Sequence, residues 1–166
     1  MNNGENKTPS NMLTCLPQSL CSWNFRVLHS DAQIGTITTH FLTEQGSFHL
    51  QNQEWTIRKP NFLTGQWNLE REGITQGKAQ KQNIFQRTFD IEYENTSWLL
   101  KAKSAFGRGF EIRRHEKVVG MIEPVHAFTR RSTIDCSDEL PQPAQLFCFW
   151  LAMIIWKRAQ NSNGGS

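Results

Sequence analysis

One segment near the C-terminal end decides the fold: Leu146–Trp156 reads LFCFWLAMIIW and consists only of apolar residues. Two prolines, Pro141 and Pro143, precede it, and a Lys-Arg pair follows it. Proline near a helix start and cations at a helix end are helix signals, and Leu, Ala and Met favour a helix over a strand. The pattern therefore predicts a helix over about residues 144–158.

A helix that is apolar all round has to be enclosed on every side, either by protein or by lipid. Eleven residues that rise 1.5 Å each span about 16 Å, which is half of a hydrocarbon core near 30 Å. We therefore expect no transmembrane span and favour a buried central helix. A membrane-inserted tail is the alternative.

Most of the chain before this helix alternates apolar and polar residues in short runs, as at Trp23, Phe25 and Val27. A period of two residues, interrupted by Gly, Asn and Pro, is typical of antiparallel strands. The sequence predicts eleven strands, at about 23–29, 33–41, 46–51, 53–59, 65–71, 75–81, 85–94, 97–104, 107–114, 117–123 and 130–136.

Two consecutive hairpins can be tested for register. In each of them, one alignment of the strands keeps apolar pairs on one face and polar pairs on the other, as a true pairing should. A short echo between residues 34–37 (IGTI) and 119–122 (VGMI) is compatible with a duplicated meander. The predicted pairs are Leu100–Ile112, Ala102–Phe110 and Lys101–Glu111 in the first hairpin, then Ile112–Val119 and Phe110–Met121 in the second.

In a chain of 166 residues, only the strands are available to enclose the helix. A sheet closed into a barrel can enclose it and leaves no exposed strand edge. We predict a mainly β, closed antiparallel barrel around the C-terminal helix, formed as a single domain by residues 21–159. Residues 1–20 and 160–166, which are rich in Asn, Gly and Ser, are predicted to be flexible tails. An external helix beside an open barrel cavity is the alternative architecture.

The composition narrows the class of protein. Hydrophobic residues make up 37% of the chain and charged residues 20%, so wholesale disorder is excluded, and a net charge of +3 does not indicate a nucleic-acid partner. The four cysteines form no metal-ligand spacing, and Cys148 lies in the apolar helix, which favours buried reduced thiols. Without a secretory signal, we expect a cytoplasmic protein that can associate peripherally with a membrane.

Motifs of catalysis or cofactor binding do not occur in the sequence. No G-x-S-x-G elbow, glycine-rich phosphate loop or H-E-x-x-H is found, and we predict neither an enzyme nor a cofactor or metal site.

Several local strings, together with this architecture, are similar to the tubby C-terminal-like superfamily, which includes tubby domains, phospholipid scramblases and LURP-one-related proteins. LURP-one-related and scramblase-like members are more similar than true tubby proteins, because the chain is short. The resemblance implies a twelve-stranded barrel around a central hydrophobic helix and, for some members, binding of phospholipid or phosphoinositide. The strings are Trp55–Arg58, Trp67–Leu69, Phe110–Ile112, Val119–Ile122, Ser132–Asp135 and the apolar helix, within residues 23–158.

The resemblance to scramblases also draws attention to Asp135–Glu139, an acidic stretch just before the helix, where calcium binding has been proposed for that family. Here the stretch lacks the alternating oxygen ligands and the turn glycine of a calcium loop. We expect a solvated loop instead.

Four basic residues on neighbouring predicted strands are the candidate lipid-headgroup site: Lys101, Lys103, Arg113 and Arg114. Arginine can fork onto phosphate oxygens, so such a group could hold an anionic headgroup. The alternative is that these cations keep the outer wall soluble, with Lys101 paired to Glu111. The leading hypothesis is a non-enzymatic barrel that docks on anionic phospholipid or a protein partner. An interaction scaffold without a lipid role and a barrel that binds a small apolar ligand are the alternatives.

Overall fold

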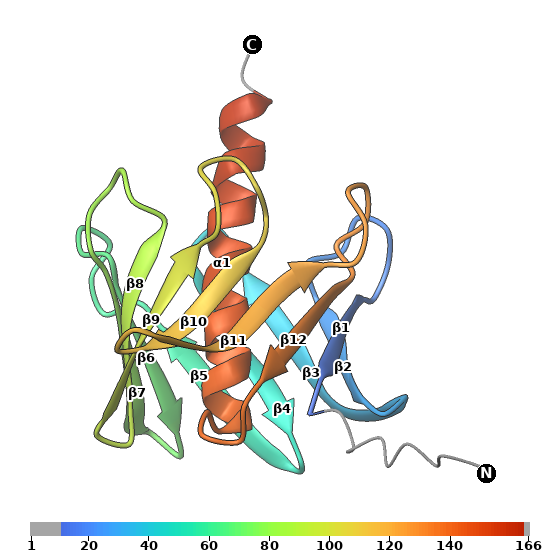
Figure 1. Cartoon of the computed structure of the whole chain (residues 1–166), viewed down its shortest axis with the longest axis horizontal. Coiled ribbons are helices and arrows are strands. Elements are labelled where there is room, and N and C mark those ends of the chain that lie inside the picture. The colour runs from blue at the N-terminus through green and yellow to red at the C-terminus, as the bar shows by residue number, and fades with distance from the viewer. Residues whose placement is uncertain (1–10, 165–166) are drawn as a thin grey trace, which may run out of the picture.

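Twelve antiparallel strands form a closed barrel, and one helix runs through its centre, in the computed structural model, which describes residues 11–164 (Figure 1). Each strand pairs with its neighbours in the sequence, and β12 pairs with β1 to close the sheet. The elements are β1 Leu13–Pro17, β2 Phe25–His29, β3 Ala32–His40, β4 Gln45–Leu50, β5 Gln53–Arg58, β6 Gln66–Arg71, β7 Ile74–Lys81, β8 Thr88–Tyr93, β9 Thr96–Ala102, β10 Phe110–Arg114, β11 Lys117–Pro124, β12 Ser132–Cys136 and α1 Gln142–Asn163.

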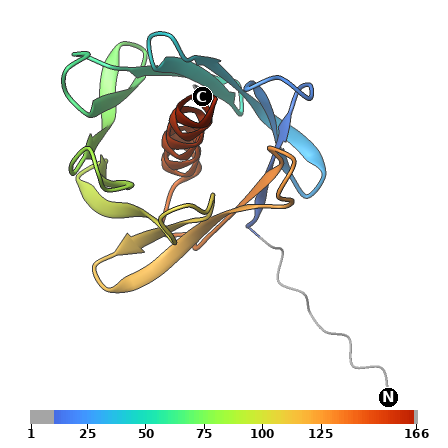
Figure 2. The same ribbon diagram turned by 90° about the horizontal axis from the view of Figure 1, so that it is seen from above.

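The helix α1 occupies the interior, as the view along the barrel shows (Figure 2). Every residue from Ala144 to Trp156 is buried, which confirms the predicted central helix. An external helix beside an open cavity is therefore wrong. The helix continues to Asn163, so residues 160–163, predicted as tail, are helical; the hydroxyl of Ser162 donates to the carbonyl of Arg158 at 3.0 Å.

The helix packs directly on the wall of the barrel. Phe149 meets Phe25 edge to face at 5.3 Å between ring centroids. Trp150 approaches Gly46 so closely that a Cβ atom there would lie 2.7 Å from the indole Nε1. The wall thus has a glycine where the largest helix side chain needs room.

The first strand was missing from the predicted set, and the predicted N-terminal tail is wrong over residues 13–17. These residues form β1, with Leu13 and Cys15 fully buried, and pair with β2 and β12. The physical reason is closure, because without β1 the strands β2 and β12 would each keep an open edge. The strand was not predicted because the region is polar overall and β1 has only two apolar residues that face inward. Residues 1–10 lie outside the described part of the chain.

All eleven predicted strands are confirmed as β2–β12, and the predicted register of β9 and β10 is confirmed. The register predicted for β10 and β11 is wrong by one residue, since Ile112 pairs with Gly120 and Phe110 with Ile122. A β-bulge beside Arg113 inserts one residue in β11, so that Val119, Gly120 and Ile122 are buried while Met121 turns outward.

The same kind of bulge recurs in three hairpins of the barrel. The hairpins β2–β3, β6–β7 and β10–β11 each contain a bulge next to a glycine, and they follow one another at every fourth strand. The predicted echo between residues 34–37 and 119–122 marks two of these three hairpins. A side chain at Gly35 or Gly120 would collide with the next strand, because its Cβ would lie 2.3 Å from the carbonyl oxygen of His49 or from Sγ of Cys136.

The two ends of the barrel differ. At the end where α1 begins, five hairpins close through two-residue turns, four of which have positive φ at both positions, as type I′ turns require. At the end where α1 leaves, six longer loops connect the strands. We call these six loops the loop rim and the opposite end the turn end. The rim loops are residues 18–24, 41–44, 59–65, 82–87, 103–109 and 125–131.

Burial of Trp150 can be tested by mutation. We expect Trp150→Ala to lower the free energy of unfolding by about 3–5 kcal/mol, because the enclosed ring leaves a cavity. The control Phe106→Ala removes a fully exposed ring and should change stability by less than about 0.5 kcal/mol. Urea unfolding followed by fluorescence measures both, and equal small losses would contradict an enclosed helix.

Candidate functional site

The predicted wall site lies on adjacent strands, but its cations do not form a free cluster. Three of the four, Lys103, Arg113 and Arg114, are ion-paired to carboxylates of the same chain. Lys103 lies at the loop rim, whereas Arg114 adjoins the β10–β11 turn, so the group is spread along the barrel. The pairs are Lys103 with Glu123, Arg113 with Glu111 at 2.8 Å and Arg114 with Glu139 at 3.1 Å.

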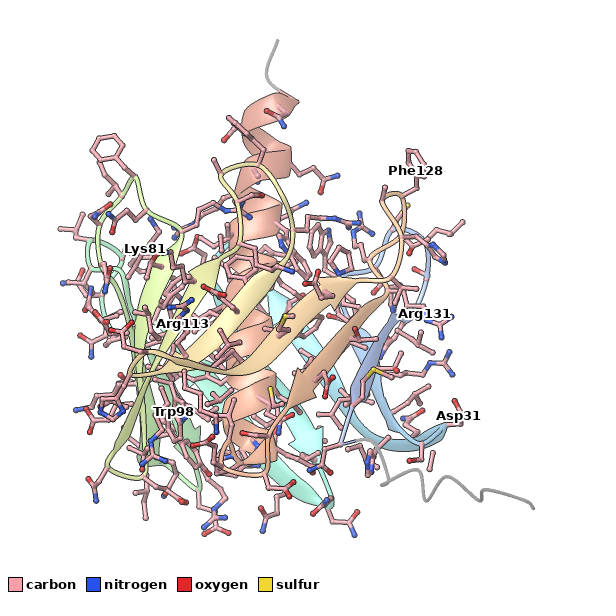
Figure 3. All side chains as sticks on the ribbon, in the orientation of Figure 1. Asp31, Lys81, Trp98, Arg113, Phe128 and Arg131 are labelled. Atoms are coloured by element: carbon pink, nitrogen blue, oxygen red, sulfur yellow. The ribbon has the colours of Figure 1, made fainter. Side chains whose placement is uncertain are left out.

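The expected ion pair between Lys101 and Glu111 does not form, although the two residues are cross-strand neighbours. Arg113, two residues further along β10, takes the Glu111 carboxylate instead (Figure 3 labels Arg113 on this wall). The wall therefore presents mostly neutralised charge, and a headgroup would have to displace carboxylates to bind there.

The loop rim carries the most exposed of the large apolar side chains in residues 11–164. Each of the six rim loops presents at least one large apolar side chain that is 71–101% exposed. Among the residues that the structure describes, no large apolar side chain outside the rim is exposed to that extent. Exposed apolar groups gathered at one place mark an interaction surface. The rim side chains are Leu20, Leu42, Phe62, Leu63, Ile84, Phe85, Phe106 and Phe128.

The same end carries most of the positive charge. The rim loops and the last turns of α1, residues 157–163, contain eight Lys and Arg residues and a single acidic residue, Glu44. At the turn end, the five hairpin turns and residues 137–141 contain six Asp and Glu residues and no Lys or Arg. The small net charge of +3 thus conceals a strong polarity along the barrel axis. Figure 3 labels Phe128 at the rim and Asp31 at the turn end.

Three arginines tie neighbouring rim loops together. Arg87 donates to three carbonyls of the β9–β10 loop at 2.7–3.1 Å. Arg108 of that loop donates to three carbonyls of the β11–β12 loop, and Arg130 of that loop donates to the carbonyls of Leu20 and Ser22. Because carbonyls are neutral, these cations hold the loops without losing their charge.

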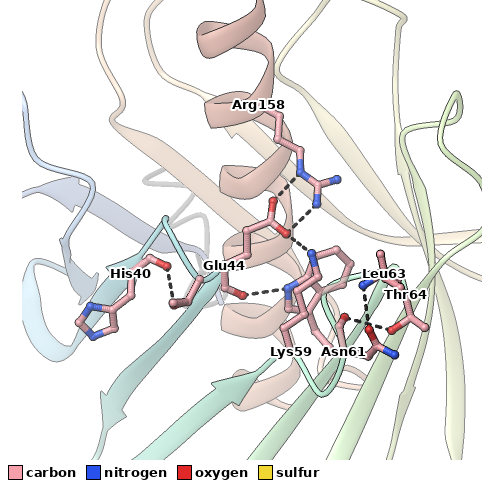
Figure 4. Close-up of polar contacts among 9 residues, drawn as sticks. His40, Glu44, Lys59, Asn61, Leu63, Thr64 and Arg158 are labelled. Atoms are coloured by element: carbon pink, nitrogen blue, oxygen red, sulfur yellow. Dashed lines mark hydrogen bonds and ion pairs between the residues drawn. The ribbon is translucent and has the colours of Figure 1, made fainter.

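Glu44 fastens the last turns of α1 to the rim (Figure 4). Its carboxylate accepts two hydrogen bonds from Arg158, at 2.6 and 2.7 Å, and one from Lys59, while its carbonyl accepts from Trp67 Nε1 at 3.0 Å. Burial raises the pKa of Glu44, but the hydrogen bonds from Arg158 and Lys59 outweigh it, so the pKa lies below its usual value. The single acid of the rim is therefore already engaged by two cations.

A cavity of about 720 Å³ opens in the rim between the β1–β2 loop, the β11–β12 loop and the end of α1. Four arginines and His126 line it together with Trp23, Trp156 and Phe128, and no carboxylate belongs to the lining. The pKa of Arg108 is lowered mainly by burial and to a smaller extent by the positive charge of Arg130. The cavity is thus both cationic and aromatic.

Sequence reasoning missed the rim altogether. The exposed residues are single apolar side chains in loops, and periodicity carries no information about such positions. The order of the strands could have indicated the rim. In an up-and-down barrel, every second connection between strands lies at the same end, and here every second connection contains Leu, Ile or Phe.

Comparisons with protein-family models, with curated proteins and with solved structures found no match. Within residues 11–164, the helix does not meet the length and hydropathy needed to cross a bilayer, and no group of three His, Cys, Asp or Glu side chains could hold a metal ion.

The Glu44 contact makes a pH-dependent prediction. Glu44→Gln should lower the free energy of unfolding at pH 7 by about 1–3 kcal/mol, because it leaves the nearly buried Lys59 without its counter-ion. Since the folded pKa of Glu44 is lowered, its contribution is present above the unfolded pKa and is lost as the pH falls through the folded value. The difference between wild type and variant should therefore shrink below about pH 4.

Denaturant unfolding at several pH values measures this difference. Glu54→Gln, at an exposed carboxylate, is the matched control and should cost less than about 0.5 kcal/mol. A Glu44→Gln penalty that is equally large at pH 3 and pH 7 would contradict the role of the charge.

Proposed function

We propose that the protein is a non-enzymatic module that docks its loop rim on an anionic membrane surface. One observation carries the proposal: large apolar side chains of six separate loops, each 71–101% exposed, lie at the cationic end of the barrel. Burying a large apolar side chain is worth about 1.5–3 kcal/mol, and each Lys or Arg near an anionic leaflet adds about 1 kcal/mol. Both contributions act in the same orientation of the barrel.

The arrangement of the exposed apolar side chains on the rim loops favours a membrane over a protein partner. The exposed apolar side chains belong to six different loops, and these loops surround the end of the helix (Figure 2). A fluid bilayer accommodates separate points of insertion, whereas a protein partner would need a matching pocket for each of them. An acidic protein partner remains the second candidate, because it would satisfy the charge of the rim.

The end of α1 is compatible with this orientation. Residues 160–163 extend beyond the buried part of the helix and are polar but uncharged, reading QNSN. Such side chains can lie among polar headgroups, while Lys157 and Arg158 add positive charge at the same level of the barrel. No charged group of α1 would have to enter the hydrocarbon core.

The wall cations predicted to hold a lipid headgroup are Lys101, Lys103, Arg113 and Arg114, whereas the docking surface proposed here is the rim. Three of the four wall cations are paired to carboxylates. Five of the eight rim cations make no ion pair within residues 11–164, and this difference supports the change: Arg87, Arg108, Arg130, Arg131 and Lys157. The similarity to the tubby C-terminal-like superfamily stays a prediction, and the proposal does not depend on it.

Vesicle co-sedimentation tests the proposal. Wild-type protein should bind vesicles of phosphatidylcholine with phosphatidylglycerol, bind pure phosphatidylcholine far less, and dissociate as salt rises. The double variant Phe85→Ser with Phe106→Ser, on two rim loops, should lose binding by about tenfold or more.

The control variant is Ile74→Ser with Val118→Ser, which removes exposed apolar side chains outside the rim. It should bind within about twofold of wild type. Equal losses in both variants, or no salt-sensitive binding by wild type, would refute docking through the rim.

A further inference from the structure

We infer that the rim cavity binds the headgroup of a single membrane lipid whose phosphomonoester adjoins its hydrocarbon chains, as in phosphatidate. This inference rests on the proposed function and extends it, because it names a ligand for one part of the rim. It is drawn from three features of the cavity: two free guanidinium groups, an excess of positive charge and an aromatic wall.

The free cations are Arg26 of β2 and Arg131 at the end of the β11–β12 loop. Both line the cavity, and neither side chain makes a hydrogen bond, ion pair or ring contact with another residue in the described range 11–164. Arg131 is labelled in Figure 3. Since no partner holds these side chains, their planar forks are available to an external anion.

The surrounding charge is positive and is not balanced within the cavity. Arg108 and Arg130 donate only to backbone carbonyls, so they keep their charge, and Arg130 also lies over the ring of Trp23 at 4.4 Å. A phosphomonoester carries a charge of about −1.5 to −2 near neutral pH and presents three acceptor oxygens. It therefore matches two guanidinium forks better than a phosphodiester, which carries a single charge.

The apolar wall restricts what can be attached to the phosphate. Trp23 and Trp156 line the cavity, and Leu20 and Phe128, exposed by 94% and 101%, stand at its edge. Arginine and apolar groups thus lie side by side, which suits a ligand in which charge and hydrocarbon are adjacent. The volume of about 720 Å³ is within the range of small-ligand sites.

The position of the cavity indicates the source of the ligand. Leu20 and Phe128 are also two of the apolar rim side chains, so the cavity opens at the face that we propose to contact the bilayer. A lipid could place its phosphate between Arg26 and Arg131 while its chains stay in the membrane. A phosphate-bearing solute would lack the chains that the apolar wall accommodates.

Calorimetry with soluble short-chain lipids separates this inference from membrane docking. Dihexanoyl phosphatidate, below its micelle concentration, should bind wild type about tenfold or more tightly than inorganic phosphate or dihexanoyl phosphatidylcholine. Arg26→Gln with Arg131→Gln should weaken the binding of phosphatidate by about tenfold or more. Thermal unfolding confirms that this double variant is folded.

Two controls identify the origin of any loss. Lys78→Gln with Lys101→Gln removes two charges elsewhere on the barrel and should leave phosphatidate binding unchanged. Phe85→Ser with Phe106→Ser should lose vesicle binding but keep phosphatidate binding, because neither side chain lines the cavity. A failure of the cavity and a failure of rim docking would thus give different results.

Three outcomes would overturn the inference. They are no binding of dihexanoyl phosphatidate to folded wild-type protein, equal binding of inorganic phosphate, and tighter binding of a short-chain phosphoinositide. Unchanged affinity in the Arg26 and Arg131 double variant would also reject the assigned site.

Discussion

The enclosure of an all-apolar helix is the constraint on which the rest of the structure depends. Residues 146–156 of α1 have no polar side chain, and the segment is too short to cross a bilayer, so the strands have to surround it completely. Complete enclosure requires a closed sheet, which is why β1 is recruited from a polar N-terminal region. It also requires small residues in the wall where the helix approaches closely, such as Gly46 next to Trp150.

Because the helix fills the interior, a functional surface has to lie on the outside of the barrel. On the outside, the two ends of the barrel differ. The turn end is built from two-residue turns and acidic side chains, and within residues 11–164 its large apolar side chains are less exposed than those that the rim loops present. The loop rim combines exposed apolar side chains with three arginines, Arg87, Arg108 and Arg130, that donate to carbonyls instead of carboxylates. These three arginines therefore have two roles. They order the rim loops, and they preserve the positive charge that an anionic surface would meet.

Sequence patterns reveal the parts of this fold that follow a period. The apolar run of α1 and the alternation in β2–β12 are long and regular, and both are confirmed. The bulge at Arg113 breaks the period by one residue, which a pattern of apolar pairs does not register, so the partner of Ile112 was predicted wrongly. The ion pairs of the wall could not be predicted for another reason: Glu123 and Glu139 come from β11 and from the loop before α1, and only the folded chain brings them near Lys103 and Arg114. The rim joins loops that are far apart in the sequence, such as those of Leu20 and Arg130, 110 residues apart, so its composition becomes visible only when the topology is known.

Spin labelling on vesicles tests most directly which part of the barrel faces the bilayer. Cys21 is the exposed cysteine of the described chain, and burial raises the pKa of the other three thiols, of Cys136 to about 12, so a Cys21→Ser background permits selective labelling. Labels introduced at Phe62 and Phe128 should gain exposure to oxygen and lose exposure to a water-soluble nickel complex on anionic vesicles. Labels at Glu72, at the turn end, and at Lys101, on the wall, should stay accessible to nickel. A membrane signature at Lys101 with water-exposed rim labels would contradict the account.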